Sequence, residues 1–359
     1  MNLCTVNPHL LTDVLSDPQR ACGLGMRDWE LLVWQARAAE LTGQLRFSLY
    51  TAGILNKAPG AAVRHLNVAW DISCKHAQAV QWELRSLRDT LDQLGVQVIL
   101  LKGAAYCAQS NRAAIGRIFN DIDILVPRAA LQIVEDNLIR AGWLSSHTNA
   151  YDERYYREWM HELPPMEHKN RSTVLDVHHT ILAPTSGFRP DPQALFAASL
   201  PLNGEWSFFR VLSPEDMVMH SACHLFFGEF HKGLRDLFDL HALLSDYCAD
   251  DRFLDRLMAR SERMGLALPV LDALQQSHRL FGTKIPMKGL RTFERRNGKR
   301  WLQWARNWFF DQVLRPNHSS ASTSVTRFAR WLAFARSHWL RMPVPLLIYH
   351  LSHKLFAAD

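Results

Sequence analysis

Two aspartates separated by one residue are the feature of this sequence best suited to chemistry. Asp121 and Asp123 flank the start of a short apolar run, 122–126, which is typical of a buried strand. Side chains alternate along a strand, so both carboxylates are expected on one face and the apolar side chains on the other. Neighbouring carboxylates repel each other unless a cation lies between them, and their oxygens suit Mg²⁺. The pair therefore predicts a magnesium site.

Residues before and after the pair could complete such a site. Lys102 and Gly103 follow the apolar run 96–101, and a glycine at this turn lets backbone N–H groups approach a phosphate closely. Asp176 lies in another predicted strand, 173–181. Three carboxylates from adjacent strands can hold two Mg²⁺ ions about 3.5–4 Å apart, as in phosphoryl transfer.

Two further residues could act beside the aspartates. Arg117 precedes the pair and is placed to reach phosphate oxygens, and His178 shares a strand face with Asp176 and could assist proton transfer. Each residue also has a structural interpretation. The pair could lie on a solvated strand edge and form a salt bridge with Arg117. Asp176 could be a hydrogen-bonding acid, Lys102 a surface lysine and His178 a histidine at the edge of the core.

The helical half of the chain offers a second set of polar residues. Lys232, Arg235 and Asp239 lie on or near one predicted helix. They would line the nucleotide cleft, or Arg235 and Asp239 would simply pair at i, i+4 spacing. His220 and His224 have the same spacing, which suits zinc, but neither a third ligand nor a His-Glu-x-x-His motif accompanies them. We therefore expect packed helix residues there.

The elements that would position these residues change in kind twice along the chain. Helical periodicity from Trp29 to Gly95 gives way to short apolar runs, and returns after Ser213, an N-cap residue before a proline. The predicted fold is α+β (mixed), a small mixed β-sheet with helices, flanked by N-terminal helices and a C-terminal helical domain. The expected divisions are an N-terminal helical region at 1–95, an α/β core at 96–211, a helical domain at 212–314 and a basic, aromatic tail at 315–359. Strands are expected at 96–101, 122–126, 173–181 and 206–211, and helices at 104–109, 129–141, 216–227 and 233–244.

Composition excludes several classes of protein. The 359 residues are 48% hydrophobic and 21% charged, which excludes collagen-like, low-complexity and wholly disordered chains. No apolar run approaches the ~20 residues of a membrane span, and no signal peptide is visible at the start. Six scattered cysteines predict reduced thiols in a cytoplasmic protein.

The positive charge of the chain is concentrated in its last fifth. Residues 287–359 contain 13 Lys/Arg and 3 Asp/Glu, a net charge of +10, so the other 286 residues carry −4 of the total +6. This segment is expected to bind an anionic partner or a membrane surface, peripheral to the inner membrane face, or to pack on the body with its arginines outward. Its Trp and Leu content favours packing, and no specific nucleic-acid motif is present.

Several of these residues together resemble a known family. The string Val-Ile-Leu-Leu-Lys-Gly-Ala at 98–104, then Gly116-Arg117, then Asp-Ile-Asp-Ile-Leu-Val at 121–126 is similar to the polymerase-β-type nucleotidyltransferases. The closer resemblance is to their uncharacterised bacterial nucleotidyltransferase branch, with its LKG…R…DIDLLV signature. Further matches are Asp-Val-His at 176–178, Leu-Ser-Pro-Glu-Asp at 212–216 and Arg-x-x-x-Asp at 235–239.

The resemblance implies Mg²⁺-dependent transfer of a nucleoside monophosphate from an NTP, with ATP as the expected donor, to an acceptor hydroxyl or phosphate. The setting would be surface polysaccharide or natural-product assembly. Asp121, Asp123 and Asp176 would hold two Mg²⁺ ions, and Asp176 would help deprotonate the attacking group. Gly103 would form the triphosphate turn. The wider superfamily has Gly-Ser there, so the Lys102 ammonium would replace the serine hydroxyl as a point charge.

Two other functions are compatible with this resemblance. The first is a non-catalytic nucleotide-binding or scaffolding module on the same fold, which the missing serine favours. The second is a tRNA-modifying nucleotidyltransferase toxin, since remote relatives have this activity. The sequence does not choose among a sugar, a small metabolite, a tRNA end and a protein as acceptor.

Overall fold

Seven strands form one mixed β-sheet in the part of the chain that this computed structural model describes, residues 7–145, 150–298 and 300–356. The strand order is β3-β4-β5-β2-β1-β7-β6. At its centre β2 is parallel to β5 and antiparallel to β1, which is parallel to β7. The strands are β1 (Val98–Leu100), β2 (Asp121–Leu125), β3 (Trp143–Ser145), β4 (Met166–His168), β5 (Val174–His178), β6 (Leu200–Pro201) and β7 (Phe209–Val211).

The four predicted strands are confirmed as β1, β2, β5 and β7, each within a residue of the predicted segment or inside it. These strands were recognisable because their apolar runs are buried in the centre of the sheet. The strands β3, β4 and β6 were not predicted. Their sequences are Trp-Leu-Ser, Met-Glu-His and Leu-Pro, and none of them lies in an apolar run like those of the predicted strands. The predicted α+β class, with a mixed sheet between helical segments, is confirmed.

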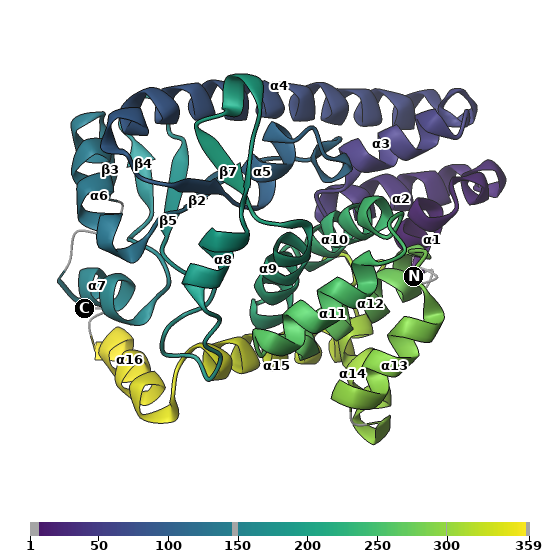
Figure 1. Ribbon diagram of the computed structural model, residues 1–359. Coiled ribbons are helices and arrows are strands. Elements are labelled where there is room, and N and C mark those ends of the chain that lie inside the picture. The colour runs from purple at the N-terminus through teal and green to yellow at the C-terminus, as the bar shows by residue number, and fades with distance from the viewer. Residues whose placement is uncertain (1–6, 146–149, 299, 357–359) are drawn as a thin grey trace.

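One long helix, α4 (Gly60–Leu91), connects the N-terminal helices to the sheet (Figure 1). Val80, Leu84, Leu87 and Leu91 are buried at the three- and four-residue spacing of one helix face. The helix contacts α2 and α3 over one part of its length and α5 and α6 over another. The other helices of this half are α1 (Leu10–Ser16), α2 (Met26–Ala38), α3 (Thr42–Thr51), α5 (Lys102–Ala108), α6 (Leu131–Arg140), α7 (Ala150–Arg154) and α8 (Pro192–Ala198).

The helical half follows the sheet and is organised around α9. Ser213 caps this helix, because its hydroxyl oxygen accepts a hydrogen bond from the backbone N–H of Asp216 at 3.2 Å. The helix contacts α10, α11, α12 and α15, so it is buried on almost every face. The helices predicted at 216–227 and 233–244 are confirmed as α9 and α10. The elements are α9 (Pro214–Phe227), α10 (Gly233–Tyr247), α11 (Phe253–Arg263), α12 (Ala267–Phe281), α13 (Met287–Asn297), α14 (Arg300–Val313), α15 (Ser324–Arg341) and α16 (Val344–Phe356).

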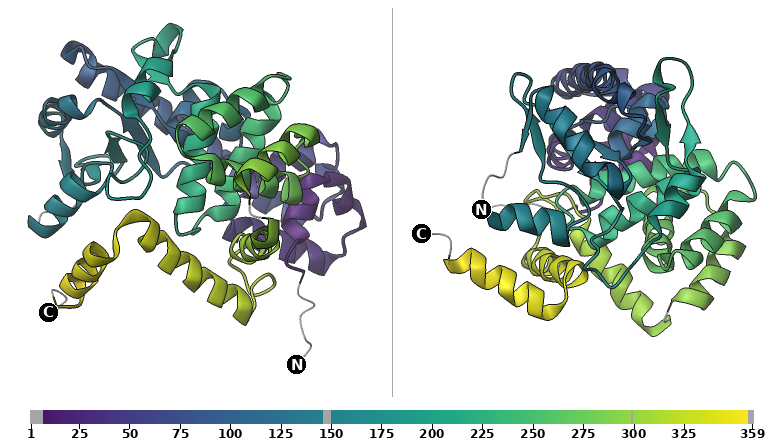
Figure 2. Two further views of the ribbon diagram at one scale, coloured as in Figure 1. Left: turned by 60° about the horizontal axis from the view of Figure 1, so that its bottom comes forward. Right: turned by 60° about the vertical axis from the view of Figure 1, so that its left-hand side comes forward.

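The basic tail packs on the body as expected, but its tryptophans face outward and one of its arginines faces inward. Trp331 and Trp339 of α15 are 61% and 65% exposed, whereas Arg336 turns inward and donates a hydrogen bond to the carbonyl oxygen of Phe226 at 2.6 Å. The prediction of outward arginines is therefore wrong for Arg336. Small side chains let the helix approach its neighbours closely, and the buried ones are Thr326, Ala329, Ala333 and Ser337. Figure 2 shows α15 and α16 as one bent arm along the molecule.

No helix in the described ranges combines the length and the apolar character needed to cross a membrane. Cys22, Cys74, Cys107, Cys223 and Cys248 are free thiols, and Cys4 lies outside the described residues.

Candidate active site

The three predicted aspartates lie on two neighbouring strands. In the parallel pairing of β2 with β5, Asp123 is directly opposite Asp176, and Asp121 is opposite Val174. Residues in register on adjacent strands share a face, and so do alternate residues of one strand. Asp121, Asp123 and Asp176, here called the aspartate cluster, are therefore brought together on one face of the sheet.

Lys102 supplies a positive charge to the aspartate cluster. It begins α5 with φ at 38°, in the left-handed region, and its Nζ lies 2.8 Å from Oδ1 of Asp123. Burial alone would lower the pKa of Lys102, but the carboxylate of Asp123 outweighs burial and raises that pKa to about 12. Burial likewise opposes ionisation of Asp123, yet Lys102 and a hydrogen bond from His178 Nε2 at 3.0 Å hold its pKa well below the usual value.

For the other two carboxylates, the nearby positive charges do not outweigh burial and like charges. Burial, with the like charges of Asp123 and Glu162, raises the pKa of Asp176 to about 7. The Oδ1 atom of Asp176 is buried and has no hydrogen-bond partner among the described residues. Desolvation by the surrounding protein and the charge of Asp123 also raise the pKa of Asp121. The cluster therefore has an excess of negative charge that a bound cation would neutralise.

The guanidinium group of Arg117 lies between Asp239 and Gly103. The Nε atom of Arg117 donates to Oδ2 of Asp239 at 2.9 Å, and both side chains are buried. The suggested salt bridge from Arg117 to Asp121 or Asp123 is therefore wrong. A Cβ atom on Gly103 would lie 2.6 Å from Nη1 of Arg117. The glycine is thus required here by the packing of a guanidinium group.

The helix α10 places a second group of charges beside the aspartate cluster. Nη1 of Arg235 lies 2.9 Å from Oε2 of Glu40, and its Nη2 lies 2.8 Å from Oδ1 of Asp236. The suggested pairing of Arg235 with Asp239 is wrong, because Arg117 takes Asp239 instead. Lys232, the N-cap residue of α10, is 3.6 Å from Oε1 of Glu40. Arg117, Arg235, Asp236, Asp239 and Glu40 are called the guanidinium cluster below.

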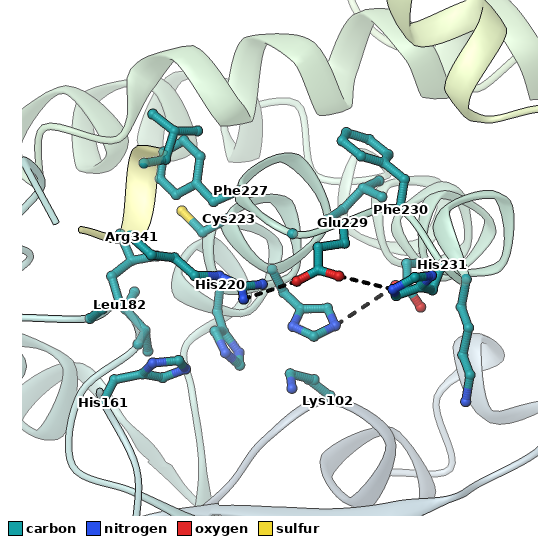
Figure 3. Close-up of a pocket in the computed structure, with 18 of the residues that line it drawn as sticks. Lys102, His161, Leu182, His220, Cys223, Phe227, Glu229, Phe230, His231 and Arg341 are labelled. Carbon is teal, nitrogen blue, oxygen red and sulfur yellow. Dashed lines mark hydrogen bonds and ion pairs between the residues drawn. The ribbon is translucent and has the colours of Figure 1, made fainter. Parts of the chain in front are cut away.

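A cavity of about 370 Å³ lies between the sheet and the turn that joins α9 to α10. Its lining includes Lys102, Asp121, Lys232 and Arg235 from the predicted site. Figure 3 shows Lys102 and His161 on one side of this cavity and Phe227 and Phe230 on the other. A smaller cavity shares Lys102, Asp121 and Arg235 and adds Arg117 and Asp239. The cavity therefore combines basic side chains with one carboxylate of the aspartate cluster.

The histidines near the cavity differ in their surroundings. Burial of His178 is outweighed by Asp123 and Glu162, which raise its pKa. His220 is buried, and burial holds its pKa well below the usual value, as expected for a packed helix residue. Both His220 and His224 line the cavity, and the charge of Lys102 lowers the pKa of His224 to about 4. Burial holds the pKa of His161 well below the usual value, so its imidazole is neutral.

Three residues at the mouth of the cavity were not recognised from the sequence. Glu229 accepts from Nη1 of Arg341 at 3.2 Å and from Nε2 of His231 at 2.9 Å. Two of them lie in the turn between α9 and α10, and Arg341 ends α15. No periodic pattern or motif marks such positions, because the contact joins segments more than 100 residues apart. The position of Arg341 beside this cavity follows only from the folded structure.

The family model described as Uncharacterised nucleotidyltransferase matches residues 25–282. The chain belongs to this family. The match contains the whole sheet, the aspartate cluster and the guanidinium cluster, and it ends at the residue after α12. Family membership supports a nucleotidyltransferase role and, with it, a nucleoside triphosphate substrate. No curated protein matches the chain.

Proposed function

We propose that the protein transfers a nucleoside monophosphate from an NTP to an acceptor hydroxyl or phosphate, with Mg²⁺ and with ATP as the donor. The observation that carries this proposal is the register of β2 and β5, which puts Asp123 opposite Asp176 on the face where Asp121 opens to the cavity. Lys102, Lys232 and Arg235 provide cations in the same cavity. Carboxylates beside clustered cations are the arrangement that a metal-bound triphosphate requires.

The residues of the aspartate cluster fit magnesium. All three offer carboxylate oxygens, which are hard ligands, and Oδ1 of Asp176 is a buried acceptor without a partner among the described residues. Asp121, Asp123 and Asp176 would hold the metal. When bound, Mg²⁺ neutralises charge on the phosphates and polarises the phosphorus–oxygen bonds.

The protein's own residues would bind and orient the donor. Lys102, Lys232 and Arg235 would contact phosphate oxygens, with Glu40 holding the last two in position. Asp176 would accept a proton from the acceptor, because a carboxyl with a pKa near 7 exchanges its proton readily at neutral pH. The chain would thus act by positioning and charge neutralisation, without a covalent intermediate.

A binding titration tests the proposal. We would titrate each of the four NTPs, with Mg²⁺ or with a chelator, into wild type, Asp123→Asn and the exposed-site control Asp251→Asn. We expect ATP to bind wild type and the control only with Mg²⁺. Loss of a metal ligand in Asp123→Asn should weaken binding at least about tenfold, or about 1.4 kcal/mol. Failure of all four NTPs to bind folded wild-type protein would refute the proposal.

A non-catalytic nucleotide-binding or scaffolding module is the second candidate. It is favoured by one observation: Lys102 and His178 already occupy Oδ1 of Asp123, so this carboxylate has partners without a metal. The two candidates differ in turnover. Labelled ATP supplied with cell extract should label an acceptor if the protein is a transferase. Tight Mg²⁺-ATP binding without labelling or pyrophosphate release would instead support the module.

We further propose that the outer face of α15 contacts an anionic membrane surface. Phe328, Trp331 and Trp339 are 57–65% exposed on this helix. Arg327 is exposed on the same helix, and neither α15 nor α16 contains Asp or Glu. Exposed aromatics on a positively charged arm are complementary to the interface of an anionic bilayer.

Vesicle sedimentation tests this proposal. Wild type should sediment with vesicles that contain phosphatidylglycerol, less with pure phosphatidylcholine, and less at high salt. Trp331→Ser/Trp339→Ser should reduce binding several-fold, whereas Trp82→Ser, on the exposed side of α4, should not. Equal sedimentation of both variants, or none for wild type, would contradict the membrane assignment. A concentration-dependent dimer that the double variant abolishes would identify a second copy as the occupant instead.

A further inference from the structure

Three side chains next to the aspartate cluster form a set that has no part in the proposed binding of magnesium or of phosphate. His161 and Glu162 lie in the segment between η6 (Tyr155–Trp159) and β4, and His178 ends β5. An isolated antiparallel bridge pairs Glu162 with His178. The N–H of Leu163 donates to the carbonyl of Val177, and the N–H of His179 to that of His161, both at 2.9 Å. The backbone therefore holds the three side chains in fixed relative positions.

The spacing of the three side chains suits a small divalent cation. Nδ1 of His178 lies 3.2 Å from Oε2 of Glu162, and Nε2 of His161 lies 3.8 Å from the same oxygen. One ligand atom from each of the three residues falls within 4.8 Å of the other two. Zinc binds nitrogen and oxygen at about 2.0–2.1 Å, which separates tetrahedral ligands by roughly 3.4 Å. A zinc ion would fit among these atoms with small side-chain adjustments.

The remaining ring nitrogens have the arrangement of a metal-bound histidine. His178 is only 2% exposed, and its Nε2 donates to Oδ1 of Asp123 at 3.0 Å. A metal-binding histidine usually donates its second N–H to a carboxylate in this way, which fixes the tautomer. The raised pKa of His178 indicates that a positive charge, from a second proton or from a metal, is favoured beside Glu162. When only Nε2 is protonated, the position opposite Glu162 is taken by the lone pair of Nδ1. Nδ1 is a buried atom with no hydrogen bond among the described residues.

A cation between Nδ1 of His178 and the carboxylate of Glu162 would remove the repulsion between the lone pair and the negative charge. The surrounding charge favours one, because the like charges of Asp123 and Glu162 both act on Asp176. His161 also lines the main cavity, and Glu162 lines a separate surface cavity of about 250 Å³. A metal held here would have an open side for water or a substrate oxygen.

We propose that His161, Glu162 and His178 form a zinc site, separate from the magnesium site of the aspartate cluster. Two imidazoles and one carboxylate are ligands that favour zinc, whereas magnesium selects oxygen ligands. Asp123 orients His178 through its Nε2 and has a second oxygen, Oδ2, for the neighbouring site. The zinc site does not depend on the transfer reaction, since it rests on the geometry of β5 and its bridge alone.

Cobalt titration tests the site directly, because tetrahedral Co²⁺ absorbs visible light and substitutes for zinc. The full chain would be treated with chelator and titrated with Co²⁺ and then Zn²⁺, with Mg²⁺ in excess to occupy the aspartate cluster. We expect one equivalent of Co²⁺ with visible absorption, displaced by Zn²⁺. His161→Gln and Glu162→Gln should each abolish the absorption and weaken metal binding at least tenfold. His231→Gln, an exposed histidine of the same cavity, should bind as wild type does.

Two outcomes would overturn the zinc site. One is Co²⁺ binding by wild type that is no tighter than binding by folded His161→Gln, which would mean that a proton on His178 satisfies Glu162. The other is loss of the signal in Asp176→Asn with retention in His161→Gln, which would place the ion in the aspartate cluster. Near-ultraviolet circular dichroism would establish that each variant is folded. No nucleotide is used, so failure here leaves the proposed transfer reaction untouched.

Discussion

Two groups of charges meet beside Lys102, and they differ in how their charges are balanced. In the aspartate cluster and the adjoining Glu162, four carboxylates face one ammonium and the imidazole of His178. In the guanidinium cluster, the two arginines face three carboxylates, with Lys232 beside Glu40. The first has an excess of negative charge, and the second is balanced by its own members.

This difference in charge balance predicts a role in ligand binding for the first group and a structural role for the second. A group with excess charge pays an electrostatic cost in the folded protein, which a bound cation removes. A balanced and buried group is stable without a ligand, even if two of its cations also contact phosphate. Loss of one member leaves the charge of another buried and unpaired. Substitutions in the guanidinium cluster should therefore change stability most, and substitutions in the aspartate cluster should change binding most.

The largest effect on stability is expected for Arg117→Met. Its guanidinium is the hydrogen-bond partner of Asp239, and both side chains are almost fully buried. Removing the arginine leaves a buried carboxylate unpaired, which should lower the free energy of unfolding by about 3–5 kcal/mol. Urea unfolding followed by tryptophan fluorescence measures this change.

The double variant Arg117→Met/Asp239→Leu is the matched control. Replacing both members of a buried pair with apolar residues is often nearly neutral, so most of the lost stability should return. The exposed variant Arg112→Met should be close to wild type. If Arg117→Met alone cost less than about 1 kcal/mol, the guanidinium cluster would not be the structural element described here.

A smaller loss is expected for Gly103→Ala. The new Cβ would lie 2.6 Å from Nη1 of Arg117 and 3.0 Å from Cδ1 of Phe119, so the guanidinium must shift. Overpacking of this kind costs about 1–3 kcal/mol. The unfolding midpoint should fall accordingly in Gly103→Ala, whereas Gly187→Ala, where a Cβ meets open space, should leave it unchanged.

The Gly103 variant also distinguishes two functions of this turn. If the glycine serves only the packing of Arg117, the combination with Arg117→Met should remove most of its cost. If it serves a triphosphate, Mg²⁺-ATP binding should remain weaker in the combined variant than in Arg117→Met. A cost of Gly103→Ala that is additive with that of Arg117→Met would show that the two residues are not coupled.

The strands of the site were predictable because each has its own apolar run and alternation fixes its faces. The arrangement of Asp121, Asp123 and Asp176 needed only two strands in register. The partner of Arg117 was not predictable, because Asp239 lies 122 residues away and no local pattern joins them. His161 and Glu162 were missed for a related reason, since an isolated bridge leaves no periodic signature.

The tail shows a different limit of sequence reasoning. Aromatic content is a good guide to burial when a helix packs on a flat apolar surface. The helix α15 does not pack in this way. Its contact face consists of small residues, such as Ala329 and Ala333, and its tryptophans are exposed. Both faces of the helix have a helical period, so the pattern alone did not identify the buried one.

An effect of opposite sign, absent at low pH and growing as pH rises, is expected for Asp176→Asn. The pKa of Asp176 is raised in the folded protein to about 7 from an ordinary value of 3.8, so the folded state binds the proton more tightly than the unfolded chain. Folding stability should therefore fall as pH rises from about 4 through about 7, and lose nothing further above that range. Asparagine resembles the protonated carboxyl and carries no charge at any pH.

The variant and wild type should thus be equally stable near pH 4, and the variant should be the more stable of the two at pH 8. Urea unfolding midpoints should be measured for both proteins at several pH values between 4 and 8. In the difference between the two midpoints, the contributions of titratable groups that both proteins share cancel. Mg²⁺ should raise the midpoint of wild type at pH 8 and have little effect on the variant, because the cation neutralises the charge that the variant lacks. A midpoint difference that is constant with pH would mean that Asp176 ionises normally. The excess negative charge beside Lys102 would then have to reside on Asp121 and Glu162, and these two carboxylates would be the expected metal ligands.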